Sequence, residues 1–290
     1  MAFARPAIDA GAGTQGDRIV GGRRVGVFLL LLFGRFVGAI ALCWLTLFTF
    51  LYLIPNAGGD PLGLQLFGDR LAVTLPLVLM AGILALLLGA GISLLAARLG
   101  GRADRTLGGF STLLSYVPPF WLGLLLALLL STTLGLLPAG GFMPWSAGAM
   151  QSLTSLVLPG LALALPHAGQ FAVRLRGAFG AEPSETEIRA LRIGGMAPSR
   201  ARWTVGIGRL LPQVPQMVGR LLASLLVGSV VVENVFYLPG LGRQVLGAAL
   251  AHDLGGLRAG LFLLIAIAAL LMLLAGLGRL AVDPALRAKR

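Results

Sequence analysis

The sequence predicts an all-helical integral membrane protein with six transmembrane helices. Two features of its composition carry that prediction: 57% of the 290 residues are hydrophobic and only 12% are charged, whereas a soluble domain carries about 25% charged residues. The third observation is that Asp, Glu, Lys and Arg are absent from several stretches of the roughly 20 residues that a helix needs to cross the hydrocarbon core. An ordinary water-soluble globular domain is therefore excluded.

The expected spans follow these uncharged stretches. A partial apolar run from Val25, interrupted only by Arg35, extends the first span towards the N-terminus. The long interval between Arg105 and Arg174 has no charge, and its Pro- and Gly-rich part, residues 136–148, predicts a turn between two helices. The predicted spans cover residues 26–54, 71–97, 106–135, 151–173, 212–237 and 259–278, within a transmembrane domain of residues 25–282.

The distribution of arginine predicts the orientation. Most of the 23 basic residues lie in the N-terminal tail, the loop RLGGRADR, the segment 174–209 and the C-terminal tail, and short loops rich in positive charge stay in the cytoplasm. Both termini are therefore predicted to be cytoplasmic. Residues 1–24 lack the apolar core of a signal peptide and are interpreted as a disordered tail, and residues 283–290 as a C-terminal tail. Topology thus explains the net charge of +12, and the dispersed arginines give no support to nucleic-acid binding.

The residue inventory excludes several kinds of site. The only lysine is Lys289, so the chain cannot carry a phosphate-binding GxxxxGK[ST] loop, and any use of ATP requires another subunit. A single cysteine, Cys43, forms no intrachain disulfide or cysteine-based metal cluster, and its apolar neighbours indicate packing. Two histidines, His167 and His252, make no HExxH motif, and no GxSxG motif occurs. We expect no catalytic residues and no metal site.

The largest polar segment, residues 174–211, lies between the fourth and fifth predicted spans. Within it, the stretch PSETEIRALRIGG predicts a short helix, with Pro and Ser at its start, two glutamates in its first turn, and Gly194 and Gly195 at its end. Two interpretations are open at this point. The helix is either a solvated connector on the membrane surface or a docking helix for a cytoplasmic partner.

Two blocks of sequence carry a resemblance to a known family. The more specific block is VVVENVFYLPGLGRQVLGAALAHD, residues 230–253, which is similar to the pattern VVVExVFxxPGLGxLxxxAxxxxD. The other is a cytoplasmic loop signature in which an Ala precedes a Gly by four positions and a Pro follows, here Ala190, Gly194 and Pro212. Together they resemble the integral membrane permease subunit of bacterial binding-protein-dependent ABC importers, in the dipeptide, oligopeptide and nickel permease branch.

The resemblance implies a permease subunit in the bacterial inner (plasma) membrane that forms part of a translocation pore for a small solute such as a peptide or nickel. It also implies a second permease subunit that is a different chain, two cytoplasmic ABC ATPase subunits that bind ATP and Mg, and an extracytoplasmic substrate-binding protein. No cofactor is expected on this chain, which contacts membrane lipid. In this family the cytoplasmic loop is a coupling helix that docks on an ATPase. The ATPase-coupling residues implied are Glu187, Ala190, Arg192, Gly194, Gly195, Arg200, Arg202 and Pro212.

Polar and kink-forming residues at membrane depth are expected pore or gating residues, because an ionisable group is costly in hydrocarbon. Glu233 has either a structural role, pairing with Arg243 or holding the PGLG turn, or a contact with substrate. His167 follows Pro166, where a kink would free a carbonyl group for it, so packing and ligand binding are both open. The full set is Glu233, Asn234, His167, Tyr116, Pro239 and Gly240.

The chain also departs from the family pattern. The loop signature has Ile188 at its acidic position, with Glu187 one step earlier, and the aromatic residue expected after Asp253 is absent. Residues 60–70 replace the sizeable external segment of most peptide permeases, which leaves the substrate open. An autonomous channel or carrier, a structural subunit of another complex and a membrane enzyme are the alternatives. The apolar centres of the spans disfavour a carrier.

Overall fold

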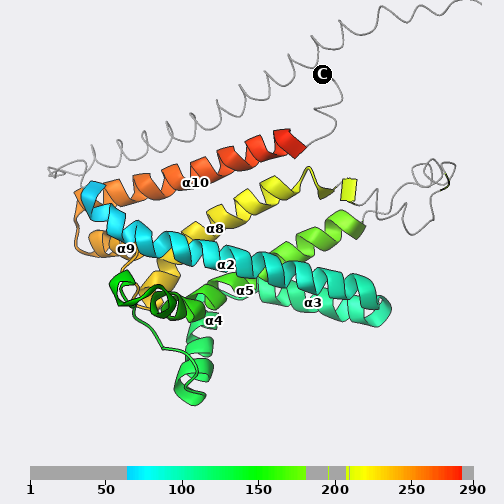
Figure 1. The fold of residues 1–290 in the computed structure, drawn as a ribbon, viewed down its shortest axis with the longest axis horizontal. Coiled ribbons are helices and arrows are strands. Elements are labelled where there is room, and N and C mark those ends of the chain that lie inside the picture. The colour runs from blue at the N-terminus through cyan, green and yellow to red at the C-terminus, as the bar shows by residue number, and fades with distance from the viewer. Residues whose placement is uncertain (1–63, 181–194, 196–206, 209, 283–290) are drawn as a thin grey trace, which may run out of the picture.

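A computed structural model describes residues 64–180, 195, 207–208 and 210–282, and every regular element in that part of the chain is a helix (Figure 1). The elements are α2 (Leu64–Leu99), α3 (Gly101–Tyr116), α4 (Pro119–Leu126), the π-helix η1 (Ala127–Thr133), the 3-10 helix η2 (Trp145–Ala147), α5 (Ala149–Gly180), α8 (Val214–Val235), α9 (Leu241–Leu250) and α10 (Leu254–Val282).

Four of these helices, α2, α5, α8 and α10, are long and apolar enough to cross a membrane, and the bent pair of α3 and α4 raises the number to five. This confirms the all-helical membrane fold. The four helices cover the second, fourth, fifth and sixth predicted spans. The first predicted span, residues 26–54, lies outside the described residues, so the count of six stays a prediction.

Three helices are longer than their charge-free stretches. Helix α5 continues to Gly180, past Arg174 and Arg176, although the predicted span ends at residue 173. Helix α2 begins at Leu64, although the sequence predicts a start after Arg70, and α10 begins at Leu254, although Arg258 marks the predicted start. A charged residue is tolerated in a helix that extends past the hydrocarbon core, because its side chain reaches the polar interface. A charge-free stretch therefore marks the part of each helix that lies in the hydrocarbon core, and it underestimates the length of the whole helix.

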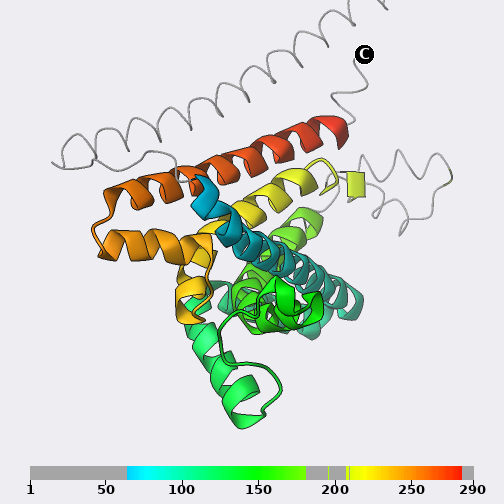
Figure 2. The same cartoon turned by 60° about the vertical axis from the view of Figure 1, so that its left-hand side comes forward.

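The expectation of one continuous helix over residues 106–135 is wrong. Helix α3 ends at Tyr116 and α4 begins at Pro119, with an angle of 101° between the two. A proline pushes the preceding residue out of the helical region, and Val117 and Pro118 are both extended. As a result α4 and η1 project away from the other helices (Figures 1 and 2). The chain returns through residues 134–148 to the start of α5.

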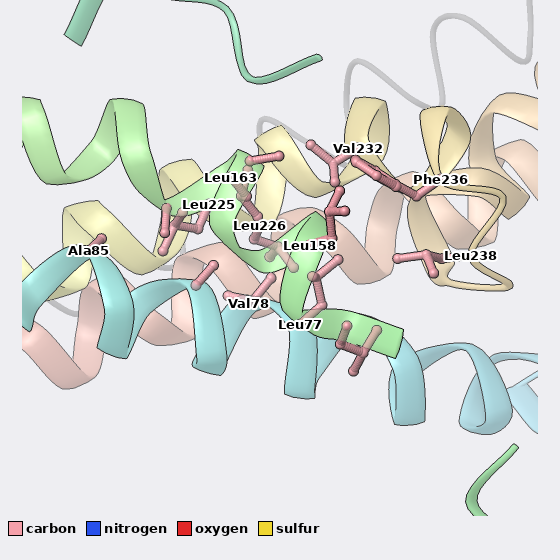
Figure 3. Close-up of a cluster of buried hydrophobic side chains, with 14 of the residues drawn as sticks. Leu77, Val78, Ala85, Leu158, Leu163, Leu225, Leu226, Val232, Phe236 and Leu238 are labelled. Carbon is pink, nitrogen blue, oxygen red and sulfur yellow. The ribbon is translucent and has the colours of Figure 1, made fainter. Parts of the chain in front are cut away.

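The hydrophobic core lies between α2, α5 and α8 (Figure 3). Leu77 of α2, Leu158 of α5 and Leu225 of α8 are all fully buried there. Helix α3 packs closely on α5 at Gly169. A Cβ atom on this glycine would lie only 2.5 Å from the carbonyl oxygen of Ser111 in α3. Close contact between helix backbones at small residues is typical of membrane helices. This packing fixes where the ends of the helices meet.

Candidate functional site

The turn between α8 and α9 is built around a buried carboxylate, that of Glu233 at the end of α8. The residue has no exposed surface. Its Oε1 accepts a hydrogen bond of 2.7 Å from the hydroxyl group of Thr74 in α2, and its Oε2 accepts one of 3.0 Å from the backbone N–H of Arg243 in α9. The Thr74 hydroxyl oxygen also accepts a bond of 2.8 Å from the backbone N–H of Leu241. One carboxylate and one hydroxyl group thus join three helices.

The glycines of the PGLG turn, which we define as residues 236–243, make room for this carboxylate. A Cβ atom on Gly240 would overlap the carboxylate group of Glu233, and one on Gly242 would lie 3.0 Å from its Oε2. The chain reverses at Tyr237, whose φ of 56° is in the left-handed region, and Leu238 then donates a backbone hydrogen bond of 2.9 Å to the carbonyl oxygen of Glu233. The motif therefore has a steric cause: only glycine fits against the carboxylate.

Two arginine side chains contact the PGLG turn: Arg70 from α2, and Arg243 from the last position of the turn itself. The guanidinium group of Arg70, in α2, donates a hydrogen bond of 3.3 Å to the carbonyl oxygen of Pro239. The guanidinium carbon of Arg243 lies 5.1 Å from the centre of the Tyr237 ring, a distance typical of a cation–π contact. The side chain of Arg243 thus contacts the ring, while its backbone N–H is the group that bonds to Glu233.

The loop of residues 134–148 contacts the same turn. The backbone N–H of Gly141 donates a bond of 2.8 Å to the carbonyl oxygen of Phe236, and the indole N–H of Trp145 donates one of 2.9 Å to the carbonyl oxygen of Ala72 in α2. The PGLG turn is therefore the place where α2, α8, α9 and this loop are all connected. We call this end of the bundle the PGLG end.

His167 lies buried in α5, away from the turn. Its Nδ1 is 2.8 Å from the carbonyl oxygen of Leu163, which accepts a bond from the Nδ1–H tautomer. A proline lacks an N–H, so Pro166 leaves the carbonyl group of Ala162 without its helical donor. His167 does not bond to that freed carbonyl group, as the sequence led us to expect, but to the carbonyl oxygen of Leu163. Packing contacts surround the ring, in line with its 7% exposure.

The other predicted pore or gating residues divide between two places. The structure brings Glu233, Pro239 and Gly240 together in the PGLG turn, and Asn234 lies beside them with its side-chain amide bonded at 2.6 Å to the carbonyl oxygen of Val230. Tyr116 lies elsewhere, at the end of α3, where 81% of it is exposed. Their roles in a pore stay predictions.

Most of the predicted coupling residues lie outside the described part of the chain. Gly195 is described, and its φ of 81° is a left-handed conformation that suits a residue just after a helix. Pro212 lies in the turn that precedes α8. The residues outside the described part are Glu187, Ala190, Arg192, Gly194, Arg200 and Arg202.

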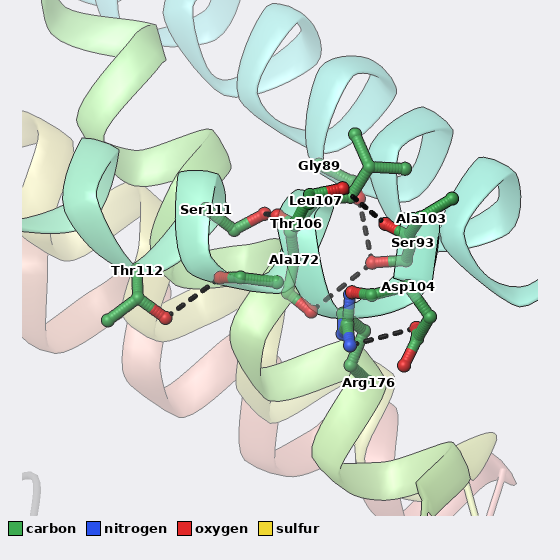
Figure 4. Close-up of polar contacts among 11 residues, drawn as sticks. Gly89, Ser93, Ala103, Asp104, Thr106, Leu107, Ser111, Thr112, Ala172 and Arg176 are labelled. Carbon is green, nitrogen blue, oxygen red and sulfur yellow. Dashed lines mark hydrogen bonds and ion pairs between the residues drawn. The ribbon is translucent and has the colours of Figure 1, made fainter. Parts of the chain in front are cut away.

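A polar cluster fastens α5 to its neighbours at the opposite end from the PGLG turn (Figure 4). Arg176 of α5 forms an ion pair of 2.8 Å with Asp104 in the first turn of α3, and it also donates a bond of 2.8 Å to the carbonyl oxygen of that residue. The hydroxyl group of Ser93 in α2 donates to the carbonyl oxygens of Gly89 and Ala172, at 2.9 and 3.2 Å. Helices α2, α3 and α5 are thus joined at the start of the predicted segment 174–211, whose first residues, 174–180, form the last turns of α5.

Sequence reasoning missed three parts of these sites. Thr74 is a single hydroxyl group in an apolar run, and its partner Glu233 is 159 positions away. Asp104 carried a weak signal as the one acidic residue in the loop RLGGRADR, but nothing indicated Arg176 as its partner. The block GRQVLGAAL was matched only as a family pattern, whereas its residues form helix α9.

The fold and these sites define a multi-pass helical membrane protein whose conspicuous polar structure is a glycine-rich turn at one end. Residues 89–288 match the family described as "Binding-protein-dependent transport system inner membrane component". The chain belongs to this family, which confirms the resemblance carried by its two sequence blocks. The match begins within α2 and includes the PGLG turn and the segment 174–211.

Similar proteins extend this result. A protein of Brucella abortus, named as a peptide transport system permease, is 34% identical over 191 residues, which cover 66% of this chain and 61% of that protein. The oligopeptide transport system permease protein AppB of Bacillus subtilis is 30% identical over 198 residues, 67% of this chain and 62% of AppB. OppB of Salmonella typhimurium is 28% identical over 190 residues, 64% of this chain and 60% of OppB. The chain thus spans about three fifths of the length of these relatives.

Proposed function

We propose that this chain is a membrane-spanning permease subunit of an ATP-driven importer, and that the imported solute is a peptide. The observation that carries the proposal is the family match over residues 89–288, which includes the glycine-rich turn around Glu233. Relatives named as peptide and oligopeptide permeases favour a peptide over nickel.

In this proposal the chain works in a complex and catalyses no reaction itself. Its partners are a second permease subunit, two cytoplasmic ABC ATPase subunits and an extracytoplasmic binding protein that delivers the solute. ATP and Mg bind to the ATPases, in line with a chain whose only lysine, Lys289, leaves no phosphate-binding loop. Both termini and the segment 174–211 lie in the cytoplasm, and the PGLG end faces the opposite side of the membrane.

The mechanism that we propose is a rigid-body movement. Helix α5 runs as one element from Ala149 to Gly180, directly into the coupling segment, and the contacts of Ser93 and Arg176 tie it to α2 and α3. A displacement of the coupling segment by the ATPases would therefore move three helices together. ATP binding then drives the change because the closed ATPase dimer favours one of two arrangements of the permease.

Purification of the tagged chain from its native membrane in mild detergent, followed by mass spectrometry, tests the composition of the complex. We expect an ATPase with a phosphate-binding loop and a second multi-pass chain in stoichiometric amounts. The purified complex in proteoliposomes should take up a tripeptide such as trialanine in the presence of binding protein and ATP. Recovery of the chain alone in several detergents would instead support an autonomous channel or carrier.

A pair of glycine variants tests the coupling segment. Gly194→Leu should weaken docking on the ATPase, because overfilling a close contact costs about 1–3 kcal/mol, which is roughly 5- to 150-fold in affinity. Gly91→Leu in α2 is the matched control, since Gly91 lies outside the segment 174–211 and a Cβ atom there meets open space. Uptake should fall in the first variant and persist in the second, with equal amounts of both in the membrane. Equal uptake in the two would contradict the coupling assignment.

A further inference from the structure

Helix α8 leaves one stripe of its surface uncovered, although it packs against α2, α4, α5, α9 and α10. The exposed residues are Arg220, Ser224, Val227 and Val231. Their spacing of four, three and four positions places them on one face of the helix. Val227 is 68% exposed and Val231 48%, so the stripe continues along most of α8. We call these four residues the α8 stripe.

The α8 stripe differs in chemistry from the exposed faces of α2 and α10. Helix α2 exposes Leu79, Ile83 and Leu87, while its two hydroxyl-bearing residues, Thr74 and Ser93, are buried. Between its two arginines, α10 has no polar side chain at all. Such faces suit contact with lipid tails. An arginine on an exposed face of a span is costly in lipid and is expected to face water or a polar partner. The hydroxyl group of Ser224, one turn further on, donates a bond of 2.8 Å to the carbonyl oxygen of Leu221 in its own helix.

Arg220 is the main polar group of the stripe. It lies six residues after the start of α8, which corresponds to about 9 Å along the helix. Its Nε donates a bond of 3.2 Å to the carbonyl oxygen of Gln216, one turn earlier in the same helix. Within the part of the chain that the structure describes, no carboxylate forms an ion pair with Arg220. The side-chain oxygen of Gln216 accepts a bond of 3.4 Å from the guanidinium group of Arg279, near the end of α10. Arg220 therefore lies one turn of α8 further into the bundle than this contact between Gln216 and Arg279.

We propose that the α8 stripe lines the water-filled path of the importer and that Arg220 binds the terminal carboxylate of the transported peptide. This inference rests on the proposed function. A planar guanidinium group can donate two parallel hydrogen bonds to a carboxylate, which makes it well suited to that group. The same positive charge repels a bare divalent cation. Of the two substrate classes of the permease branch, peptides and nickel, the α8 stripe therefore favours a peptide.

Cysteine accessibility tests whether the stripe faces water. Because Cys43 is the only cysteine, Cys43→Ser provides a background in which Ser224→Cys or Val227→Cys is the single thiol. Leu79→Cys in α2 and Leu270→Cys in α10 are matched controls on exposed apolar faces. In native membrane vesicles, a water-soluble methanethiosulfonate should label the two α8 positions and leave the controls unlabelled. Absence of label at both α8 positions would mean that lipid or another subunit covers the stripe, and would overturn the proposal.

The charge of the reagent tests the role of Arg220. A sulfonate-bearing methanethiosulfonate is an anionic probe, and a trimethylammonium-bearing one is cationic. At Ser224→Cys, one helical turn from the guanidinium group, the anionic probe should react faster by a factor on the order of ten. Arg220→Gln should abolish this preference and Arg220→Lys should retain it. A ratio of rates that stays the same in Arg220→Gln would overturn the assignment of Arg220 as an anion-binding residue.

Uptake then distinguishes the inference from the function on which it rests. The uptake of two peptides by the reconstituted complex is compared. One is trialanine, and the other is trialanine amide, which lacks the terminal carboxylate. The wild-type complex should prefer the free acid several-fold, and Arg220→Gln should lose the preference while still transporting the amide. A preference that is unchanged in Arg220→Gln would refute the carboxylate site. If the wild-type complex transports neither peptide in the presence of ATP, the proposed function fails. The two labelling experiments would still decide whether the α8 stripe is exposed to water and whether Arg220 attracts anions.

Discussion

At the scale of the residue, Glu233 explains why the PGLG turn has its sequence. A carboxylate without exposed surface has to be satisfied by hydrogen bonds, because burying an unpaired polar group costs several kcal/mol. Thr74 and the backbone N–H of Arg243 supply those bonds. The same carboxylate occupies the space that a side chain at Gly240 would need, while a side chain at Gly242 would meet the backbone of Val230 in α8 as well as the carboxylate. The position of the Glu233 carboxylate and the glycines of the PGLG turn therefore depend on each other.

A substitution at Gly240 tests this steric relationship. Gly240→Ala should lower the thermal stability of the purified protein, because overpacking against a buried group costs about 1–3 kcal/mol. The midpoint of thermal unfolding, followed by the fluorescence of the four tryptophans, measures the effect.

Gly247→Ala in α9 is the control, since a Cβ atom there meets no neighbour within 4 Å. It should leave the midpoint unchanged or raise it, because alanine is a better helix former than glycine. Equal midpoints for the two variants would show that the turn tolerates a side chain at Gly240.

At the scale of the element, the prolines of this chain act in two different ways. Pro118 and Pro119 separate α3 from α4 by an angle of 101°. Pro159 and Pro166 lie inside α5, which continues as one helix over 32 residues. Helix α5 is packed against α2, α3, α4 and α8, and these contacts hold it together where a hydrogen bond is missing. A single proline is thus tolerated inside the packed helix α5, whereas the consecutive pair Pro118–Pro119 ends α3 because each proline holds the residue before it in an extended conformation.

Replacing both prolines of the break should extend α3. In Pro118→Ala/Pro119→Ala, the interval regains two N–H donors and loses the restriction that keeps Val117 extended. Spin labels at the exposed positions Phe110 and Leu128, introduced as cysteines in the Cys43→Ser background, report the distance between the two arms. We expect a longer distance than in the parent chain, and an unchanged distance in Pro159→Ala. If the double variant keeps the short distance, packing alone maintains the bend.

This difference between prolines explains what the sequence could and could not predict. Stretches without charge indicated α2, α5 and α10, because charged groups are costly in hydrocarbon, and a largely apolar stretch that contains Arg220 and Glu233 indicated α8. The break at Pro118 was missed, since the same residue type lies inside α5 without breaking it. Glu233 and the PGLG turn were recognisable as a block of sequence. Thr74 and Arg176 were not, because their partners are distant in the chain and only the packed helices bring them together.

At the scale of the whole molecule, two polar clusters lie at opposite ends of α5. The loop before its first turn contacts the PGLG turn through Gly141, and its last turns contact α3 through Arg176. Between these points α5 packs mainly in the apolar core, with one weak bond of 3.5 Å from the Gln170 amide to the carbonyl oxygen of Ser115 in α3. The stronger polar contacts are therefore concentrated at the two ends of α5.

The ion pair of Arg176 and Asp104 can be tested by charge reversal. Arg176→Asp places two acids in contact and should lower stability by about 1 kcal/mol, a modest amount because 41% of the Asp104 side chain is exposed. The double variant Arg176→Asp/Asp104→Arg should restore most of the loss. Thermal midpoints of the four proteins form a double-mutant cycle, and additive effects would show that the pair contributes nothing.

The cluster at Glu233 also has a consequence for the rigid-body movement proposed above. Since the carboxylate and Thr74 bind the end of α8 to α2 and α9, that end would be the fulcrum of any tilt of α8. Helix α8 has 22 residues, which gives a lever of about 33 Å. Each degree of tilt about the fulcrum therefore displaces the far end by about 0.6 Å while the near end stays in place. In the proposed movement, a small rotation would therefore displace the region around Arg220 far more than the PGLG turn.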